Sequence, residues 1–435
     1  YTVTLTIPQG YSATTTNPVS TSVGPDTTVN FGMKPPNTIS GNVFVDQNKD
    51  GLQNGSDANY TGGITISPSP SGATVTYPNP AGNYLISGLT GGTYTISYTS
   101  LPVGYQLTYP LNGPPPSFSV TVGSGCSAGG SNSASCDANG NITALRYGIT
   151  NSIPWIQTTG GDPYLGSGIS NPIPDNNPSC GPYMSLRGAG GTPGIVFTGN
   201  GSVNLGFGQA SQNPANWLVG QPPYTQTYTP KGTELKTSYN TMYQTALRSN
   251  ITRTPLGNSQ CGAGGIANCV LSASLASGVY IANGNLTLTG ASYTFPGGKD
   301  FIILVNGDLN IQTEVHVPIG SSAFFTASGN INVAPTVGEA TVTSTRANVE
   351  GYYSADRNFY VQGTSSCPTA DKRLNVEGSI AVNAALTGGS FVNQRDLCAG
   401  NLQCPASTVT ERPDFVLNSP EFLKSARRVW QEIAP

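Results

Sequence analysis

The chain has few charged residues and no long hydrophobic run. Only 9% of its 435 residues are charged, and the formal net charge is −3 at pH 7. No apolar run reaches the roughly 18 residues that a membrane-spanning helix needs, and the 18 basic residues are scattered along the chain. The composition therefore argues against a membrane span in this chain and against a nucleic acid as its partner.

Histidine is almost absent, and the cysteines lack the spacing of a metal site. His316 is the only histidine, and the eight cysteines form no CxxC or Cys/His pattern, which argues against zinc. An even number of cysteines, several of them close together, predicts disulfides made in an oxidising compartment outside the cell. The expected pairs are Cys126–Cys136, Cys261–Cys269, Cys398–Cys404 and, by elimination, Cys180–Cys367.

Glycine, proline and small polar residues are abundant instead. The 55 glycines and 34 prolines show no collagen period and are typical of many short strands joined by turns. We therefore expect an all-β protein. Alternating apolar residues predict an antiparallel β-sandwich over residues 36–150, with strands at 39–45, 64–67, 84–86, 93–98 and 117–122.

An acidic loop follows the first of these strands. From Asp46 to Asp57, side chains with oxygen atoms stand at positions 1, 3, 5, 9 and 12, and Gly51 stands at position 6, where the chain must turn. Calcium takes roughly 6–8 oxygen ligands and is bound by loops of this spacing, in which position 7 offers a backbone carbonyl. The loop therefore predicts a Ca²⁺ site with the ligands Asp46, Asn48, Asp50, Leu52 and Asp57.

The chain begins with part of a repeat. Residues 1–11 (YTVTLTIPQGY) resemble residues 94–105 (YTISYTSLPVGY), so we interpret residues 1–35 as the C-terminal part of another copy of the domain at 36–150. Alone, these strands would leave sheet edges and an apolar face open. We expect upstream domains of the same longer chain to complete them, or self-association in which a neighbouring subunit donates strands.

Two segments of the sandwich carry a family resemblance. VFVDQNKDG (43–51) and GNYLISGLTGGTYTISYTSLPVGY (82–105) resemble the calcium-binding B-type domains of serine-aspartate-repeat and collagen-binding bacterial surface adhesins. The resemblance covers residues 38–125 and, in part, 1–33. It implies an Ig-like or prealbumin-like sandwich that is repeated in surface stalks and stiffened by calcium. Residues 123–135 depart from the family pattern.

A second architecture follows residue 190. The phrase YIANGNLTL (280–288) recurs at 303–311, 325–333, 353–361 and 374–382, with an earlier copy at 197–205. A period of this length with a glycine corner is typical of a solenoid, and the pattern resembles right-handed parallel β-helices. Stacked copies would form three apolar columns and one polar column. The columns would be Tyr280, Ile303, Phe325, Tyr353 and Leu374; Leu286, Leu309, Ile331, Phe359 and Ile380; Leu288, Ile311, Val333, Val361 and Val382; and Asn285, Asp308, Asn330, Asn358 and Ser379.

Boundaries and helices follow from these patterns. Residues 151–190 would be a linker or cap, and 191–418 a parallel β-helix with an insertion at 206–277. Apolar residues at helical spacing predict a helix at 232–250 within the insertion. A second helix, at 419–435, would cap the open end of the solenoid or dock onto another subunit.

Catalytic residues are scarce. GCSAG (125–129) matches the GxSxG motif but lies in a Gly/Ser-rich loop, where that motif does not place a nucleophile. The acidic residues of the repeats, Asp308, Asp356 and Glu377, fall in different columns, and His316 is expected to be a solvated turn residue. Only the analogy of fold therefore supports a polysaccharide lyase or hydrolase.

These observations predict a non-enzymatic extracellular structural protein, a subunit of a fibre or appendage on a bacterial cell surface with calcium-stiffened stalk domains. The alternative is an adhesin whose β-helix binds a glycan or a host protein, with Tyr352 and Tyr360 as platforms. A structural subunit should self-associate without a ligand, whereas an adhesin should stay monomeric and bind glycans.

Overall fold

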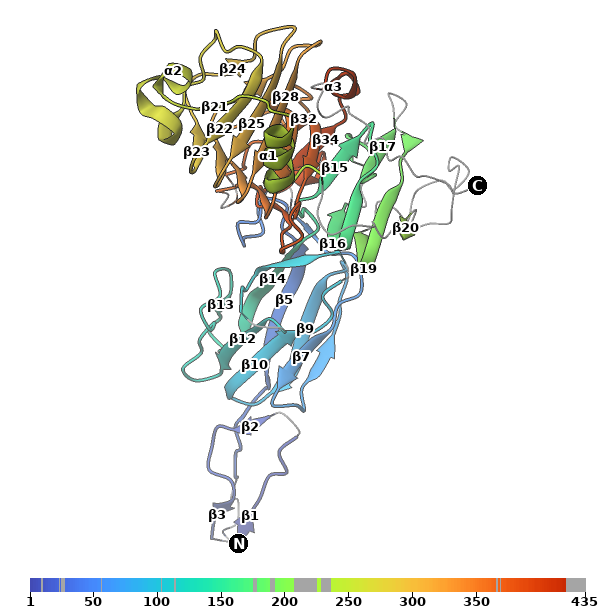
Figure 1. Ribbon diagram of the computed structural model, residues 1–435. Coiled ribbons are helices and arrows are strands. Elements are labelled where there is room, and N and C mark those ends of the chain that lie inside the picture. Colours follow the sequence, from blue (N-terminus) through green and yellow to red (C-terminus); the bar gives the residue numbers. More distant parts are fainter. Residues whose placement is uncertain are drawn as a thin grey trace, which may run out of the picture. The chain divides into compact units, whose positions relative to one another are not determined.

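The computed structural model describes residues 1–435 except 9–10, 23, 25–27, 56, 103, 113–114, 175–177, 188–191, 207–224, 228–235, 365–366, 368 and 420–435. The chain divides into two compact units, Tyr1–Ser152 and Ile153–Pro435. Strands dominate both units (Figure 1), so the expected all-β class is confirmed. No helix among the described residues is long and apolar enough to cross a membrane.

The first unit is built from two main sheets. One has the strand order β11-β14-β5-β9-β8, in which β6 also pairs with β5 and β13 with β14. The other has the order β12-β10-β7. All their pairs are antiparallel except β14 with β5, which is parallel. The strands are β1 Thr2–Val3, β2 Ser12–Ala13, β3 Val19–Ser20, β4 Met33–Lys34, β5 Asn37–Val45, β6 Ala58–Asn59, β7 Ile66–Ser69, β8 Thr74–Thr76, β9 Asn83–Leu89, β10 Gly92–Tyr98, β11 Gln106–Tyr109, β12 Ser117–Val122, β13 Ser135–Cys136 and β14 Ile142–Thr150.

Side chains from both sheets share one core. Ile86 of β9, Ile96 of β10, Val120 of β12 and Tyr147 of β14 are all fully buried in it. The Tyr147 hydroxyl donates to the Ile96 carbonyl over 2.5 Å, which links the two sheets directly. Buried residues alternate with more exposed ones along β10 and β12, because successive side chains of a strand point to opposite faces.

The described residues of segment 1–35 form two short strand pairs. β1 pairs with β3 and β2 pairs with β4, both antiparallel. In the matching repeat, by contrast, β10 pairs on both edges, with β12 and with β7. Val3, Ile7 and Met33 remain exposed. In the described part of this segment, β1 pairs with β3 alone and β2 with β4 alone, and these apolar side chains are uncovered.

The described part of the second unit is built mainly of parallel strands, with one antiparallel pair, β17 with β18, and a few short helices. Its long sheet runs β18-β17-β15-β34-β32-β30-β28-β25-β22-β21, and a second sheet runs β23-β26-β29-β31-β33. The elements are β15 Ile156–Thr159, β16 Tyr164–Ile173, β17 Ser185–Arg187, β18 Thr192–Pro193, β19 Val196–Gly206, β20 Thr225–Thr227, α1 Tyr239–Arg248, β21 Arg253–Pro255, α2 Asn258–Cys261, η3 Gly262–Asn268, β22 Gly278–Ala282, β23 Leu286–Leu288, β24 Tyr293–Thr294, β25 Asp300–Val305, β26 Leu309–Ile311, β27 Val315–His316, β28 Ser322–Ala327, β29 Ile331–Val333, β30 Val349–Ala355, β31 Phe359–Val361, β32 Leu374–Ala381, β33 Phe391–Asn393, η4 Cys398–Leu402, β34 Ser407–Thr410 and α3 Asp414–Leu417.

Equivalent apolar residues stack between successive strands, as the repeat predicts. The observed columns are Tyr280, Ile303, Phe325 and Tyr353; Leu286, Leu309, Ile331 and Phe359; and Leu288, Ile311, Val333 and Val361. All of these side chains are buried in one shared core. β22, β25 and β28, which carry the first three residues of the first column, lie side by side in Figure 1.

The last predicted copy is out of register. Ile380, not Leu374, lies opposite Tyr353, and Phe391 and Asn393 of β33, not Ile380 and Val382, continue the other two columns. The sequence LNVEGSIAV imitates the repeat six residues too early. In the structure this stretch extends β32 along β30, and Gly378 pairs with Gly351.

The polar column forms a hydrogen-bonded ladder. The side-chain oxygens of Asn285, Asp308, Asn330 and Asn358 each accept a bond from a backbone amide of the next coil, over 2.7–3.1 Å. The last of these bonds comes from Ser390 rather than from the predicted Ser379. These side chains satisfy turn backbone groups that the sheet leaves free.

Several expected boundaries shift. Residues 151–190, expected to be a linker or cap, provide β15, which pairs in parallel with β34, and β16, which pairs in parallel with β19. The coils begin at β21, inside the predicted insertion. The helix expected at 232–250 is found as α1, whose buried Met242 and Ala246 pack on the sheet residues Ile302 and Phe324. Residues 228–235 and most of the helix expected at 419–435 lie outside the described residues.

Candidate metal centre

The Asp46–Asp57 loop is held at both ends by the seven-stranded sheet. It begins where β5 ends, and the Asp46 amide donates to the Ile149 carbonyl of β14 over 2.7 Å. The loop returns through β6, which pairs antiparallel with β5 and places Ala58 opposite Val45. Gly51 has φ +75°, a left-handed conformation that other residues adopt only with strain. The sheet therefore fixes the two ends and glycine permits the turn between them.

The loop gathers three carboxylates. Asp46, Asp50 and Asp57 each offer an oxygen atom, and these atoms lie within 4.8 Å of one another. Asp46 is fully buried. Its Oδ2 accepts the Gly51 amide over 2.9 Å, whereas its Oδ1 has no hydrogen-bond partner among the described residues. Thr108 lies near this carboxylate, but its hydroxyl lacks the geometry of a hydrogen bond.

Amide groups complete the cluster. The side-chain nitrogens of Asn48 and Asn54 donate to Asp50 Oδ2 over 3.0 and 2.7 Å. The backbone amide of Leu52 donates to Asp50 Oδ1 over 2.8 Å, so position 7 lies against the cluster while the Leu52 side chain is exposed. Asp57 accepts the amides of Gln47 and Asn54 and so closes the loop. The side chains of Asp46, Asn48, Asp50 and Asp57 therefore come together, with Asn54 beside them.

The charges in the cluster are unevenly stabilised. Burial raises the pKa of Asp46, and the nearby Asp57 carboxylate raises it further. Burial also acts on Asp50, but hydrogen bonds from Asn54, Leu52 and Asn48 outweigh it and lower the pKa of that carboxylate. A buried, ionised carboxylate with an unpaired oxygen is costly unless a cation neutralises it.

This set of donors fits a hard divalent cation. Calcium prefers carboxylate, amide and carbonyl oxygens, and it needs several of them from one flexible loop. The buried Asp46 Oδ1 is free of hydrogen bonds from the described residues and can offer an oxygen to such a cation, and rotation of the Asn48 and Asn54 amides would add oxygens. Asp57 is one methylene shorter than the glutamate usual at position 12, so it reaches less far into the site.

Residues outside the loop also contact it. The Asn132 side chain donates to the Gly51 carbonyl over 2.7 Å. The Tyr109 side chain lies against Gly51, 3.4 Å from where a Cβ would be. Sequence reasoning missed both residues, because they are distant in sequence and neither belongs to a ligand motif.

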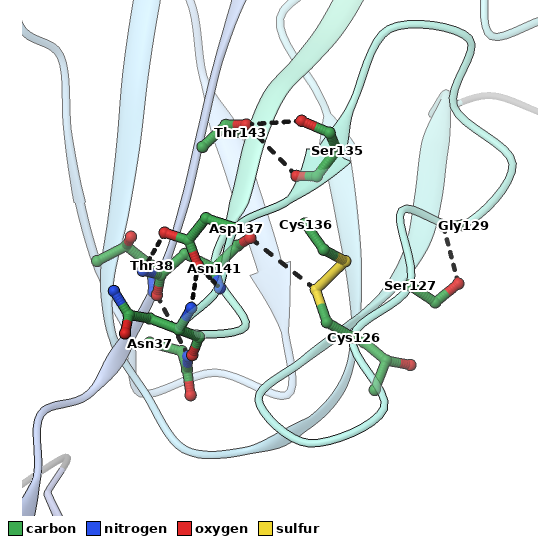
Figure 2. Close-up of a disulfide and its surroundings, with 12 residues drawn as sticks. Asn37, Thr38, Cys126, Ser127, Gly129, Ser135, Cys136, Asp137, Asn141 and Thr143 are labelled. Atoms are coloured by element: carbon green, nitrogen blue, oxygen red, sulfur yellow. Dashed lines mark hydrogen bonds between the residues drawn. A yellow bond between two sulfur atoms is a disulfide. The ribbon is translucent and has the colours of Figure 1, made fainter.

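All eight cysteines form disulfides. Cys126–Cys136 (Figure 2) and Cys261–Cys269 are the expected pairs. The other two expected pairs are wrong, since Cys180 bonds Cys404 and Cys367 bonds Cys398. The reason is that β15 lies beside β34, which brings residue 180 to residue 404, while η4 separates Cys398 from Cys404. Cys367, Cys398 and Asp396 cluster closely, but the sulfurs are bonded to each other and cannot ligate a metal.

A charged cluster in the second unit corrects the expectation for His316. Its Nδ1 lies 3.0 Å from Glu350 Oε1, and its Nε2 lies 3.5 Å from Glu314 Oε2. Glu350 also accepts a hydrogen bond from Arg412 over 2.9 Å and lies in register with Glu377 of the next strand. The histidine is thus a partly buried member of an ion-pair network, and hydrogen bonding to Glu350 raises its pKa.

The two tyrosines expected to be exposed binding platforms are only partly exposed. Tyr352 is half-buried between Phe324 and Phe415, with ring centroids 5.6 and 5.4 Å away. Tyr360 is also half-buried, on β31. Ser127 of the GCSAG segment forms backbone hydrogen bonds with Thr121, in a bridge between the end of β12 and the disulfide loop.

Comparisons with protein-family models, with curated proteins and with solved structures find no match to this chain. The four disulfides indicate a protein of an oxidising compartment outside the cytoplasm.

Proposed function

We propose that this chain is a non-enzymatic extracellular structural protein, a subunit of a bacterial cell-surface fibre or appendage whose first unit is stiffened by calcium. The observation that carries the proposal is the Asp46–Asp57 loop. A fully buried aspartate with an unpaired oxygen stands there beside two further carboxylates within 4.8 Å. Such an arrangement is stabilised by a bound cation and is costly without one.

The proposed folds are an Ig-like or prealbumin-like sandwich of the B type at 36–150 and a parallel β-helix in the second unit. Two sheets around one core support the first assignment. Columns of buried residues between parallel strands, together with the ladder from Asn285 to Asn358, support the second. The sequence resemblance to the B-type stalk domains links the sandwich to the bacterial surface.

Calcium would supply positive charge that joins distant parts of the loop. Asp46, Asp50 and Asp57 would bind it through carboxylates, Asn48 through its amide oxygen and Leu52 through its carbonyl. Because these groups come together only in the folded loop, binding stabilises the folded state by mass action. A stalk domain whose strand ends are fixed in this way resists local opening under tension.

Thermal unfolding of the full chain tests the calcium site. At free calcium 100 times above the dissociation constant, binding adds about 2.7 kcal/mol to the free energy of unfolding. The melting temperature of the first unit should therefore be higher in millimolar calcium than in chelator. Asp50→Asn should remove most of this difference, whereas the matched variant Asp137→Asn, outside the loop, should retain it. Equal melting temperatures of the wild-type protein in calcium and in chelator would refute the site.

Residues 1–35 support the proposed assembly. Among the described residues, Val3, Ile7 and Met33 are exposed and β1 pairs on one edge only, so strands from elsewhere could cover them. Upstream domains of the same polypeptide or strands donated by a neighbouring subunit would supply them. Electron microscopy of the purified chain should show ordered polymers without added ligand if neighbours donate strands, and the mass of the native chain tests for upstream domains.

One groove favours the alternative of an adhesin. It lies on the outer face of β28, β30 and β32 beside α1, has a volume of about 380 Å³, and is lined by Met242, Phe324 and Tyr352 among others. Aromatic side chains next to polar groups can bind sugar rings. Specific binding on a glycan array by a chain that stays monomeric would favour the adhesin over the fibre subunit.

A further inference from the structure

A segment closed by a disulfide reaches the acidic loop from a distant part of the first unit. Cys126 and Cys136 are bonded, and Asn132 lies between them. The Asn132 side chain donates to the Gly51 carbonyl over 2.7 Å, although 81 residues separate the two. The Gly51 carbonyl belongs to the peptide that leads into Leu52, whose own carbonyl is the predicted backbone ligand. Asn132 therefore restrains the backbone immediately before that ligand.

Tyr109 connects the two segments further. Its hydroxyl accepts the Asn132 amide over 2.8 Å and donates to the Gly130 carbonyl over 3.2 Å. Its side chain packs against Gly51. The backbone and the side chain of Asn132 are thus both fixed by hydrogen bonds, and Tyr109 occupies the space between the disulfide segment and the loop.

The disulfide segment is itself anchored. Cys136 belongs to β13, which pairs with β14, and the Ser133 hydroxyl donates to the Ala144 carbonyl of that strand over 2.9 Å. Figure 2 shows the disulfide and the contact of Ser135 with Thr143 of β14. β14 is the strand that also receives the Asp46 amide. One strand therefore supports both the acidic loop and the segment that covers it.

We infer that Asn132 is a positioning residue of the calcium site and that the disulfide-closed segment 126–136 raises the affinity of the Asp46–Asp57 loop for calcium. This inference rests on the proposed calcium site. Groups that orient metal ligands from outside typically change metal affinity about 10- to 100-fold when they are removed. Asn132 holds the loop backbone near the conformation needed for binding, so less ordering remains when calcium binds.

Calorimetric titration of the full chain with calcium chloride tests the inference. Asn132→Ala should weaken calcium binding about tenfold, and Tyr109→Phe should weaken it less, because the ring stays against Gly51. Asn139→Ala is the matched control, since Asn139 is exposed and lies outside both segment 126–136 and the loop; it should bind like wild type. The rise in melting temperature that calcium produces should be smaller in Asn132→Ala than in wild type, which the loss of a hydrogen bond from the calcium-free protein alone would not give.

A second variant separates the disulfide from Asn132. Cys126→Ala with Cys136→Ala frees the segment while keeping Asn132, and it should also weaken calcium binding several-fold, within the range expected for outer groups. Wild-type affinity in both Asn132→Ala and the double cysteine variant would overturn the inference while leaving the calcium site intact. No binding by the wild-type chain would overturn the calcium site, and the inference with it.

Discussion

Replacing Leu309 tests whether stacked apolar columns hold the second unit together. Leu309 is fully buried and lies between Leu286 and Ile331, its register partners in β23 and β29. The next residue, Asn310, points to the opposite face, where its side-chain oxygen accepts the Asn332 amide over 2.9 Å. Two adjacent positions therefore have opposite surroundings, and the same new residue can be placed at each.

The expected costs differ by several kcal/mol. Leu309→Ala removes buried methyl groups and leaves a cavity, which costs about 2–5 kcal/mol. Leu309→Asp also puts a carboxyl group among apolar side chains, where a polar group without a hydrogen bond costs roughly 2–7 kcal/mol more. Folded domains are stable by only about 5–15 kcal/mol, so the aspartate variant should fail to fold. Asn310→Asp keeps the acceptor for Asn332 and should cost about 1 kcal/mol.

Tryptophan fluorescence during urea unfolding measures these effects in the correct unit. All three tryptophans belong to the sequence of the second unit, and Trp155 is buried there, with its indole nitrogen donating to the Asn401 carbonyl over 2.9 Å. Leu309→Ala should lower the urea midpoint, Leu309→Asp should abolish the cooperative transition, and Asn310→Asp should nearly match wild type. Equal behaviour of the two aspartate variants would show that the two side chains do not face opposite sides.

Two further perturbations address the hydrogen-bonded parts of the second unit. Hydrogen bonds to Glu350 and Glu314 raise the pKa of His316 on folding, so its contribution to the free energy of unfolding is present below the unfolded pKa of about 6.5 and is lost as the pH rises through the folded value. His316→Gln should therefore cost about 1–2 kcal/mol in urea unfolding at pH 5.5 and much less at pH 9. A cost that grows with pH would contradict this pairing. Gly329→Ala would place a Cβ 2.1 Å from Asp308 Oδ1, so the ladder must shift and the melting temperature should fall, whereas Gly320→Ala, where no atom lies near the new Cβ, tests the effect of backbone strain alone.

The repeats of the second unit were predictable because each column depends on local periodicity. The first four copies of the phrase YIANGNLTL, at 280–361, give the observed register. Each has apolar residues at the same positions, and three of the four have glycine at the corner, where the fourth has Arg357. The register predicted for the copy at 374–382 was wrong because apolar residues two positions apart occur on both sides of Gly378, so the sequence fits more than one register. The pairing of β32 with β30, from Val376 opposite Val349 to Ala381 opposite Ser354, shows the true register.

The candidate site divides in the same way between local and distant information. Asp46, Asp50 and Asp57 come together because their spacing within one loop is set by the chain itself. Asn132 meets Gly51 only because β14 lies next to β5, a parallel pair between strands about a hundred residues apart. The cystine Cys180–Cys404 was missed for the same reason, because β15 and β34 meet only in the folded unit.

The amide ladder fits the low charge of the chain, because most of the side chains that bind the backbone at the corners are neutral. Successive coils must satisfy the backbone groups at every corner. Three of the four side chains that do so here are neutral amides, Asn285, Asn330 and Asn358, and the fourth is the carboxylate of Asp308. Hydrogen bonds between neutral groups are not screened by salt and do not titrate near neutral pH, unlike exposed ion pairs. Buried Arg395 acts in a similar way, since it donates to three backbone carbonyls. If the proposed fibre role holds, varying salt and pH would leave such a stack intact, and the response of the chain to the medium would come mainly from the Asp46–Asp57 loop and the cluster around His316.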